Sequence, residues 1–224
     1  MLSEDHTVKV EHLADPTTTD LEQLEPIYIA GFPPSERDPF EDLVRTIRQG
    51  GLTLLVARDG GPEGAIAGFM LLLPSLPGTT AAYLPYFAID ARRRGQGIGS
   101  RLFGFMRDFL AGQGQVDAVV WEIEAQVPGD AEALPNRRLR FYQRLGGRLV
   151  TMLPDYLMPN FEGGIIPAHL MWIPIGARQH DPDRAEVVGW VRSIYAIGYP
   201  QHRDLGEQIV AELARREGVC VECR

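Results

Sequence analysis

Three glycines that alternate with other residues stand at the expected start of a helix, in the sequence ARRRGQGIGSRL of residues 91–102. Gly95, Gly97 and Gly99 have no side chain, so the backbone can approach a ligand closely at these positions. The first backbone N–H groups of a helix have no acceptor within the helix, and with the helix dipole they favour anions. A phosphorylated ligand is therefore the first candidate for this segment.

Two common phosphate-binding motifs fit the segment poorly. A Walker A loop needs Lys followed by Ser or Thr after its last glycine, whereas Gly99 is followed by Ser100 and Arg101. A dinucleotide fingerprint spaces its glycines as G-x-G-x-x-G near the start of a β-α-β unit, whereas the spacing here is G-x-G-x-G, late in an antiparallel run. The first motif is excluded, and the second is a weak match.

The composition is that of a soluble globular protein of 224 residues, of which 45% are hydrophobic and 23% charged. The formal net charge of −8 argues against a nucleic-acid partner, because binding to a phosphate backbone relies on clustered Lys and Arg. No apolar run reaches the length of a membrane span, and the first residues lack the pattern of a secretory signal. We therefore expect a cytoplasmic protein with a neutral or cationic small substrate and no membrane partner.

Metal-binding patterns are absent from the sequence. The five histidines share no ligand spacing such as H-x-x-x-H, so we predict no metal site. Cys220 and Cys223 form a lone C-x-x-C pair, which supplies only half of a tetrahedral zinc site. We interpret this pair as part of a solvent-exposed tail.

The spacing of the apolar residues predicts where the strands and helices lie. Strands are expected at residues 8–13, 52–58, 65–73, 81–89, 117–125, 148–153 and 169–175. Helices are expected at residues 20–32, 38–47, 97–112, 136–147, 184–197 and 205–217. A Gly-rich turn between a strand and a helix in the middle of the chain indicates the α/β class.

Two details of the helices follow from the same sequence. Asp38 precedes Pro39, and Glu41 follows three residues after Asp38, which predicts a capped start for the second helix. The third helix is expected to end near Gly112. Its predicted buried face consists of Ile98, Leu102, Phe105, Met106 and Phe109.

The segment RRRGQGIG resembles the R/Q-x-x-G-x-G/A signature of the GNAT acetyltransferases, with Arg92, Gly95 and Gly97 at the defining positions. Two more segments extend the likeness. YFAID resembles the family's strand that lines pantetheine, and RFYQRLGG resembles its late-helix pattern x-x-Y-x-x-x-G-F. The resemblance covers roughly residues 80–150, and the order of strands and helices from residue 8 to residue 175 also fits the fold.

The chain departs from the family pattern at two positions. Gly146 is followed by Gly147, where many relatives have Phe. Asn136 precedes Tyr142 by six residues, one fewer than the common spacing. The resemblance therefore assigns no role to Asn136.

The resemblance implies a GNAT-like fold of the mixed α/β (α+β) class. We expect a mostly antiparallel central sheet of about seven strands, flanked by helices, with extra helices at the C-terminus. Residues 1–178 are predicted to form the acetyltransferase domain. Residues 179–224 are predicted to form a helical extension that packs on this domain or lies at a dimer interface, because amphipathic helices must bury their apolar stripe.

Acetyl-CoA is the co-substrate that the resemblance implies. Its pyrophosphate would lie against the N–H groups at the start of the third helix, and its pantetheine amides would pair with the preceding strand. The residues implied in cofactor binding are Phe87, Ala88, Ile89, Arg92, Arg94, Gly95, Gln96, Gly97, Ile98, Gly99 and Ser100. For at least one arginine the alternative is a solvated turn.

An acid and a base are needed for acetyl transfer to an amine. An alkyl ammonium has a pKa of about 10.4, so a base or a water relay must remove a proton before the amine attacks. WEIEA places Glu122 and Glu124 on one face of a strand, and either carboxylate is a candidate base; the alternative is a solvated face. Tyr142 matches the tyrosine that protonates the departing thiolate in many GNAT enzymes; the alternative is packing against its helix neighbours.

Two residues are candidates for binding the acceptor. Glu36 lies in the loop between the first two helices, from which it could reach a substrate cleft. Tyr156 lies between two prolines in a loop where relatives shape the acceptor pocket, although a loop aromatic can equally cover the core.

We therefore predict an N-acetyltransferase that transfers acetyl from acetyl-CoA to a primary amine of a small molecule or peptide, by direct attack in a ternary complex. A non-catalytic acyl-CoA-binding regulatory module is the alternative from another class. A second enzyme alternative uses a hydroxyl acceptor or a longer acyl donor. The C-terminal helices leave a homodimer open.

Overall fold

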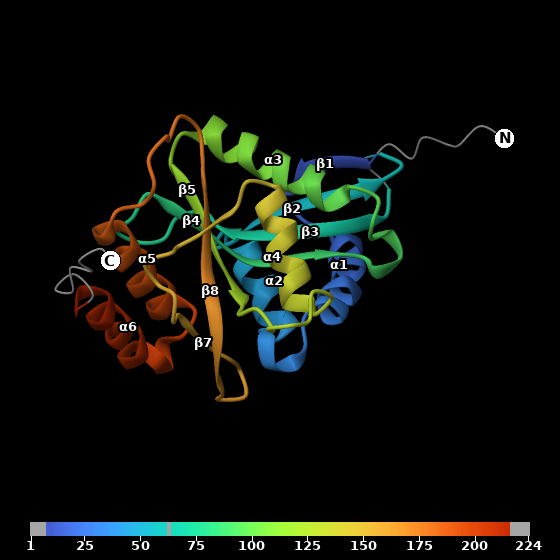
Figure 1. The fold of residues 1–224 in the computed structure, drawn as a ribbon. Helices are drawn as coiled ribbons and strands as arrows, with labels where there is room; N and C mark the ends of the chain where they lie inside the picture. The colour runs from blue at the N-terminus through green and yellow to red at the C-terminus, as the bar shows by residue number, and fades with distance from the viewer. Residues whose placement is uncertain (1–7, 62–63, 216–224) are drawn as a thin grey trace. The chain divides into compact units, whose positions relative to one another are not determined.

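The computed structural model describes residues 8–61 and 64–215 (Figure 1). By its internal contacts the chain divides into two compact units. The first unit comprises the described residues up to Pro74 together with Leu84–Val116, and the second comprises Ser75–Tyr83 together with the described residues from Asp117 onward. The division at residue 178 that the sequence suggests stays a prediction.

The first unit combines a sheet with helices. Its strands are β1 (Val8–His12), β2 (Thr53–Asp59), β3 (Ile66–Leu73) and the greater part of β4 (Ala81–Ile89). Its helices are α1 (Thr18–Gly31), α2 (Phe40–Arg48) and α3 (Ile98–Gln113), with short 3-10 helices η1 (Pro34–Glu36) and η2 (Ala91–Arg93). β1 pairs with β2, and β2 with β3, in antiparallel register.

The sheet of the first unit is covered on both faces. Leu54 and Val56 of β2 pack in a core with residues of α1 and α2, among them Tyr28. Leu55 and Ala57 alternate with them along β2 and are also buried. α3 contacts β1, β2 and β3, so the strands are apolar on both sides.

The first two helices begin in different ways. At α1, Asp20 N donates to Thr17 Oγ1 (3.2 Å) and Thr17 N donates to Asp20 Oδ2 (2.8 Å), which forms a capping box. The predicted cap of α2 by Asp38 is wrong, because the N-cap is Pro39 and no side chain caps the helix. The Asp38 carboxylate instead accepts a hydrogen bond from Tyr86 Oη of β4 (2.8 Å).

α3 ends at Gly114, whose φ of +65° is the left-handed conformation that favours glycine. Its buried residues are Ile98, Leu102, Phe103, Met106 and Leu110. The predicted face was therefore wrong at Phe105 and Phe109, which are only partly buried. Their rings stack with centroids 6.1 Å apart, and Phe109 also contacts His12 of β1. Because α3 packs across three strands, its buried face includes Phe103 and Leu110 instead.

The second unit also combines strands with helices. Its strands are the start of β4, β5 (Ala118–Glu124), β6 (Arg148–Leu149), β7 (Leu157–Pro159) and β8 (Ile165–Pro174). Its helices are α4 (Leu134–Arg144), α5 (Arg184–Ile197) and α6 (Arg203–Arg215), with the 3-10 helix η3 (Pro200–His202) before α6. Residues 81–83 of β4 pair in parallel with β5, whereas β5, β6 and β7 each pair antiparallel with β8.

The predicted fold class is confirmed: the fold is mixed α/β, with an open, mostly antiparallel sheet flanked by helices. The described residues form eight strands, where the sequence predicts about seven. The additional strand is β7, whose three residues lie in the Pro-rich segment expected to be a loop. β6 has only two residues of the expected strand at 148–153, because the chain turns at Val150, where Leu153 N donates to Val150 O (3.0 Å).

The two C-terminal helices bury their apolar stripes within the second unit. α5 packs against α6, and the ring of Trp190 lies 6.3 Å from that of Trp172 on β8. Six apolar residues of the two helices are buried: Trp190, Ile194, Tyr195, Ile209, Val210 and Leu213.

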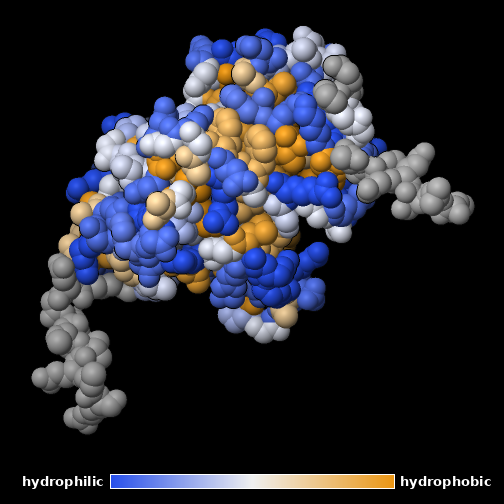
Figure 2. All heavy atoms as spheres, turned by 90° about the horizontal axis from the view of Figure 1, so that it is seen from above, coloured by the Kyte–Doolittle hydropathy of each residue, from blue (hydrophilic) through white to orange (hydrophobic). Residues whose placement is uncertain are grey.

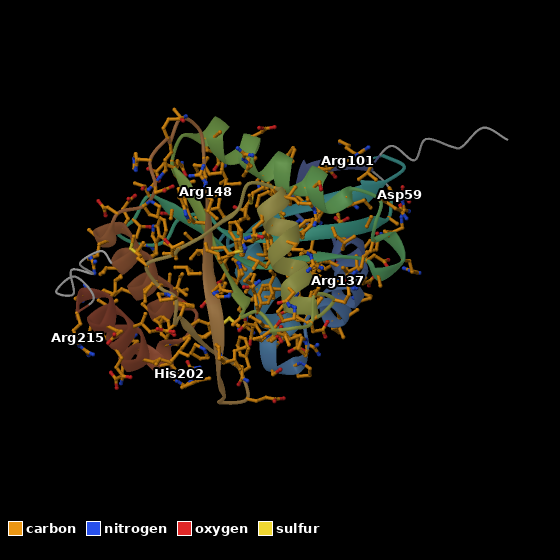
Figure 3. All side chains as sticks on the ribbon, viewed as in Figure 1. Asp59, Arg101, Arg137, Arg148, His202 and Arg215 are labelled. Atoms are coloured by element: carbon orange, nitrogen blue, oxygen red, sulfur yellow. The ribbon has the colours of Figure 1, made fainter. Side chains whose placement is uncertain are left out.

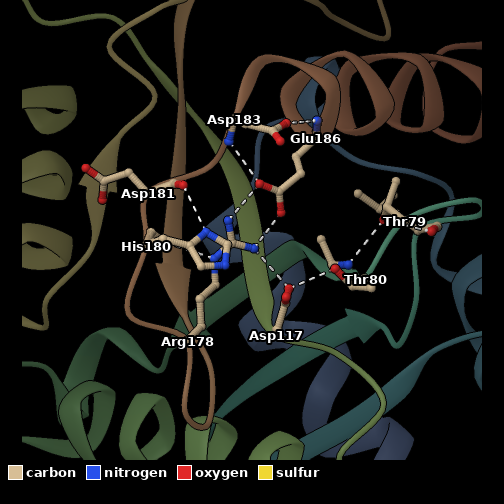
Figure 4. A network of polar contacts seen from close by, with 10 residues as sticks. Thr79, Thr80, Asp117, Arg178, His180, Asp181, Asp183 and Glu186 are labelled. Atoms are coloured by element: carbon tan, nitrogen blue, oxygen red, sulfur yellow. Dashed lines mark hydrogen bonds and ion pairs between the residues drawn. The ribbon is translucent and has the colours of Figure 1, made fainter.

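Arg178 joins the start of α5 to the sheet of the second unit (Figure 4). Its guanidinium donates to Asp117 Oδ1 (3.1 Å) and to both carboxylate oxygens of Glu186 (2.7 and 3.0 Å). The side chain is 1% exposed, and its Cζ lies 5.2 Å from the ring centroid of Trp172. A buried guanidinium is stable only when its N–H groups have acceptors, so these contacts fix the position of the helix start.

The surface is that of an ordinary globular chain. Hydrophilic residues cover much of the face drawn in Figure 2, with apolar residues between them. No helix within residues 8–61 and 64–215 is long and apolar enough to span a bilayer. No group of three or more His, Cys, Asp or Glu side chains in those ranges is arranged to hold a metal ion. Cys220 and Cys223 lie outside the described residues.

Replacing Arg178 with leucine should lower the free energy of unfolding by about 2 to 4 kcal/mol, because two partly buried carboxylates lose their cation. The matched control is Arg192→Leu, since the Arg192–Glu207 pair (2.9 Å) is exposed at both side chains (54% and 57%). The control should leave the free energy of unfolding within measurement error. Urea unfolding measures both variants, and equal losses would contradict the role given to Arg178.

Candidate active site

The glycine turn before α3 has an open backbone. Gly95 has a φ of +78°, and Gly97, the N-cap of α3, has a φ of +77°, so both occupy the left-handed region. A Cβ atom added at either position would meet no protein atom within 4 Å. The left-handed conformation favours glycine at both positions, and the space beside them leaves the backbone open to close approach by a ligand.

The backbone N–H groups that follow this turn point out of the helix start. The first hydrogen bond of α3 runs from Arg101 N to Gly97 O (3.1 Å). The N–H groups of residues 98–100 precede it and have no acceptor within the helix. With 16 residues, α3 also has a full dipole, so its start suits an anionic group.

The three arginines of the turn have different surroundings. Arg93 donates to Asp59, labelled in Figure 3 at the end of β2, and to Gln96 Oε1 (3.0 Å). Arg92 is paired with Asp90 (2.7 Å) and its side chain is 87% exposed. Arg94 makes only a long contact with Ile89 O (3.4 Å). Arg93 therefore braces the turn through the side chain of Gln96, whereas Arg92 and Arg94 keep their charge at the surface.

Residues 87–89 form the end of β4, directly before the turn. β3 supports this end: Asp90 N donates to Ala67 O (2.9 Å), and a Cβ added at Gly68 would lie 3.0 Å from Ala88 O. The parallel pairing of β4 with β5 comprises three residue pairs and ends at Tyr83↔Val120. The backbone of residues 87–89 thus lies beyond the part of β4 that pairs with β5.

The Glu122 carboxylate is the centre of a polar cluster in the second unit. Oε2 accepts hydrogen bonds from Tyr83 Oη (2.5 Å) and Tyr199 Oη (2.9 Å), and Oε1 accepts one from Tyr156 Oη (2.6 Å). We call Glu122 and these three tyrosines the carboxylate cluster. Four different segments contribute to it: β4, β5, the loop before β7 and the connection between α5 and η3.

The electrostatics of the carboxylate cluster are unusual because no cation takes part. Among the described residues, the three tyrosines are the hydrogen-bond donors to Glu122. Glu122 forms no ion pair with a described Lys, Arg or His side chain. Burial raises the pKa of the Glu122 carboxyl, and the hydroxyl donors partly oppose this increase. Burial and the nearby carboxylate raise the pKa of Tyr156 and Tyr199 well above the usual value, so both hydroxyls keep their protons.

Glu124 lies on the same face of β5 but in a different setting. Its Oε2 is 3.2 Å from Arg138 of α4, and both side chains are partly exposed (27% and 30%). The structure thus pairs one of the two candidate bases with a cation and places the other among tyrosines.

Tyr142 packs against Trp121 of β5, with ring centroids 5.0 Å apart. Burial raises its pKa to about 12. Close packing also explains why residue 147 is a glycine. A Cβ at Gly147 would lie 2.9 Å from both the Trp121 side chain and the Tyr142 carbonyl oxygen, so no larger residue fits.

Asn136 organises the loop between β5 and α4. It accepts from Val127 N (3.0 Å) and donates to Val127 O (2.8 Å) and Asp130 O (2.5 Å). These bonds give this buried residue a role in shaping the chain before α4.

Glu36 ends η1 in the first unit, where Glu36 N donates to Pro33 O (2.9 Å). The neighbouring Arg37 donates to the carbonyls of Ile29 (3.2 Å) and Phe32 at the end of α1. These bonds fix the segment that carries Glu36, and its contact with an acceptor stays a prediction.

Sequence reasoning missed Tyr83 and Tyr199. Tyr83 follows the period-2 pattern of β4, so its position on one face could have been noted. Tyr199 lies 77 residues from Glu122 along the chain, and no local pattern connects them. The hydrogen bond from Tyr156 to Glu122 was also missed, because 34 residues separate them along the chain.

Comparison with known proteins finds a family model that matches part of the chain. Residues 50–146 match the family model of the acetyltransferase (GNAT) domain. No curated protein sequence matches the chain.

Solved structures share the fold. One is a GNAT-family protein from Bacteroides thetaiotaomicron, with a TM-score of 0.63 and 23% identity, covering 85% of this chain and 98% of the other. Another is an aminoglycoside 6'-N-acetyltransferase complexed with coenzyme A (TM-score 0.59, 18% identity, 77% and 99% covered). A third is the ribosomal-protein-S18-alanine N-acetyltransferase from Escherichia coli (TM-score 0.53, 21% identity, 79% and 99% covered). The chain therefore shares its fold with these acetyltransferases, and its residues 50–146 match the family model of the acetyltransferase (GNAT) domain.

Proposed function

We propose that the protein is an N-acetyltransferase that transfers acetyl from acetyl-CoA to a primary amine of a small molecule or peptide. The observation that carries this proposal is the Glu122 carboxylate, which three tyrosine hydroxyls hold and no described cation neutralises. A negative charge in such surroundings attracts an ammonium group. Two of the similar structures are N-acetyltransferases by name, which supports an amine acceptor.

The open turn before α3 supports coenzyme A as the carrier of the acyl group. The N–H groups of residues 98–100 would hold the pyrophosphate, and Arg92 and Arg94 would add positive charge. The backbone of residues 87–89 would pair with the pantetheine amides as an added strand does. Bound acetyl-CoA supplies a thioester whose carbonyl carbon an amine can attack.

Glu122 is the first candidate for the base. Its carboxylate takes a proton from the bound ammonium, which yields a neutral amine and a carboxylic acid. The raised pKa makes Glu122 a better proton acceptor near neutral pH than an ordinary glutamate. Glu124 and a water relay are the other candidates, although Arg138 holds Glu124 as an ion pair.

Tyr142 is the proposed donor to the departing thiolate. With a pKa of about 12, its hydroxyl keeps its proton at neutral pH. A thiol has an ordinary pKa of about 8.5, so donation of a hydrogen bond to the developing thiolate is more favourable than complete proton transfer.

Acceptor binding involves two further residues in this proposal. Tyr156 acts through its hydrogen bond to Glu122 (2.6 Å). Glu36 is the candidate contributed by η1.

Calorimetric titration with acetyl-CoA, followed by turnover with a panel of amines, tests the whole proposal. Binding without turnover of any amine would favour the non-catalytic acyl-CoA-binding module.

The Gly97→Ala variant should weaken acetyl-CoA binding about tenfold or more, because the added methyl group occupies the space that the pyrophosphate would fill. Gly114→Ala is the matched control: it changes the other end of the same helix, at a φ of +65° and with the same open surroundings. Both variants strain the backbone, so only a difference between them reports on the ligand. Equal affinities by calorimetry would remove the turn from the binding site.

The Tyr142→Phe variant should keep its affinity for acetyl-CoA and lose about 10- to 100-fold in kcat, because a hydrogen bond to developing charge is lost. Tyr28→Phe is the control, since burial also raises the pKa of Tyr28 to about 12 and its hydroxyl bonds only within the first unit, to Asp38 O (3.0 Å). Unchanged kcat in Tyr142→Phe would leave this residue with a packing role alone.

The Glu122→Gln variant should gain stability relative to the native chain as the pH rises. The folded chain holds the Glu122 proton more tightly than the unfolded chain, whose carboxyl has a pKa of about 4.3. Native stability therefore falls as the pH rises from that value through the raised pKa, and glutamine does not titrate. Urea unfolding between pH 4 and pH 8 measures the difference. Glu124→Gln, which removes a carboxylate paired with Arg138, should show no such gain; a gain in both variants would contradict the assignment.

A further inference from the structure

Tyr199 reaches Glu122 from outside the matched GNAT segment. Residues 50–146 carry Glu122 and Tyr83, whereas Tyr199 lies between α5 and η3 in the C-terminal part of the chain. Its hydroxyl is 2.9 Å from Glu122 Oε2. The C-terminal helices therefore bring a polar group to the proposed base.

Both ends of α5 are fixed, which determines where Tyr199 lies. A capping box of Asp183 and Glu186 starts the helix, and Arg178 binds the same Glu186 carboxylate. At the other end, Tyr195 Oη donates to Leu157 O of β7 (2.5 Å).

α6 holds this second end of α5 in place. A Cβ added at Gly206 of α6 would lie 2.7 Å from Tyr195 Cγ, so the helix backbone packs directly on that ring. The ring of Tyr195 in turn lies 5.4 Å from that of Tyr199. The helices thus leave little freedom to the side chain that meets Glu122.

The carboxylate cluster leaves room for one more donor. An ionised carboxylate has about four acceptor positions on its two oxygens. Tyr83 and Tyr199 occupy both positions on Oε2, and Tyr156 occupies one on Oε1. In the part of the chain that the structure describes, Tyr156 is the one donor to Oε1, so the remaining position on this oxygen is where a substrate ammonium would donate.

We propose that Tyr199 is a positioning residue, which holds Glu122 Oε2 so that Oε1 faces the acceptor amine, and that the C-terminal helices thereby complete the acceptor side of the site. The preferred acceptor is a primary ammonium, which donates to Oε1 and then gives this oxygen its proton. This inference rests on the proposed function, since it takes Glu122 as the base.

Removal of the Tyr199 hydroxyl has a defined electrostatic consequence. A hydrogen bond donated to the charged carboxylate stabilises that form, so Tyr199→Phe should raise the pKa of Glu122 further. The acidic limb of the pH profile of kcat/KM should then move to higher pH, with about a tenfold loss on that limb that disappears at alkaline pH.

Tyr28→Phe is the matched control. It also removes the hydroxyl of a buried tyrosine, at a position in the first unit whose partner is Asp38 O (3.0 Å) rather than Glu122. The control should leave the acidic limb in place. All variants are compared with one amine from the panel, so titration of the substrate is common to them.

Carbon-13 NMR of labelled glutamate carboxyls measures the pKa of Glu122 directly, with Glu122→Gln to assign the signal. A higher pKa in Tyr199→Phe but not in Tyr28→Phe, together with the kinetic shift, supports the proposal. An unchanged pKa in Tyr199→Phe overturns the contact itself. A raised pKa without any change in the kinetic limb overturns the catalytic role of Glu122, and with it the positioning role of Tyr199.

Discussion

A buried guanidinium needs an acceptor for nearly every N–H group, and Arg178 meets this requirement by drawing three segments of the second unit together. Asp117 before β5 and Glu186 in the first turn of α5 both bind it, while its flat face lies on Trp172 of β8. The direction of α5 follows from this anchor, because the capping box uses the same Glu186 carboxylate. The place of Tyr199, two residues beyond the other end of the helix, depends on that direction.

Two glutamates on one strand face have opposite electrostatic settings. Glu124 is neutralised by Arg138 and remains partly exposed. Glu122 is stabilised only by hydroxyl dipoles, which compensate a buried charge less completely than a cation does. The difference separates a residue suited to surface stability from one suited to proton transfer, although both have the same spacing and side chain.

The turn before α3 shows a similar division among its charged residues. Arg93 is bound to Asp59 and Gln96, so its charge maintains the turn, whereas the neighbouring Arg92 extends into solvent. The open glycine backbone and the unpaired N–H groups of the helix start are set by main-chain conformation. The anion binding that we propose at this point would thus rely mainly on the backbone, with the arginines as an addition.

The sequence by itself determined the local features of this protein. The alternation of apolar residues predicted most strands, and the helix at residues 184–197 was correct at both ends. The glycine signature resembles that of the GNAT acetyltransferases, whose domain model matches residues 50–146. These features depend on interactions between neighbouring residues, on the backbone angle φ and on the periodicity of the apolar side chains. Only the tertiary structure decided that Asp38 binds Tyr86 instead of capping α2, that β7 exists, and that Glu122 rather than Glu124 meets three tyrosines. Each of these depends on hydrogen bonds between residues far apart in the chain, which local propensity does not encode.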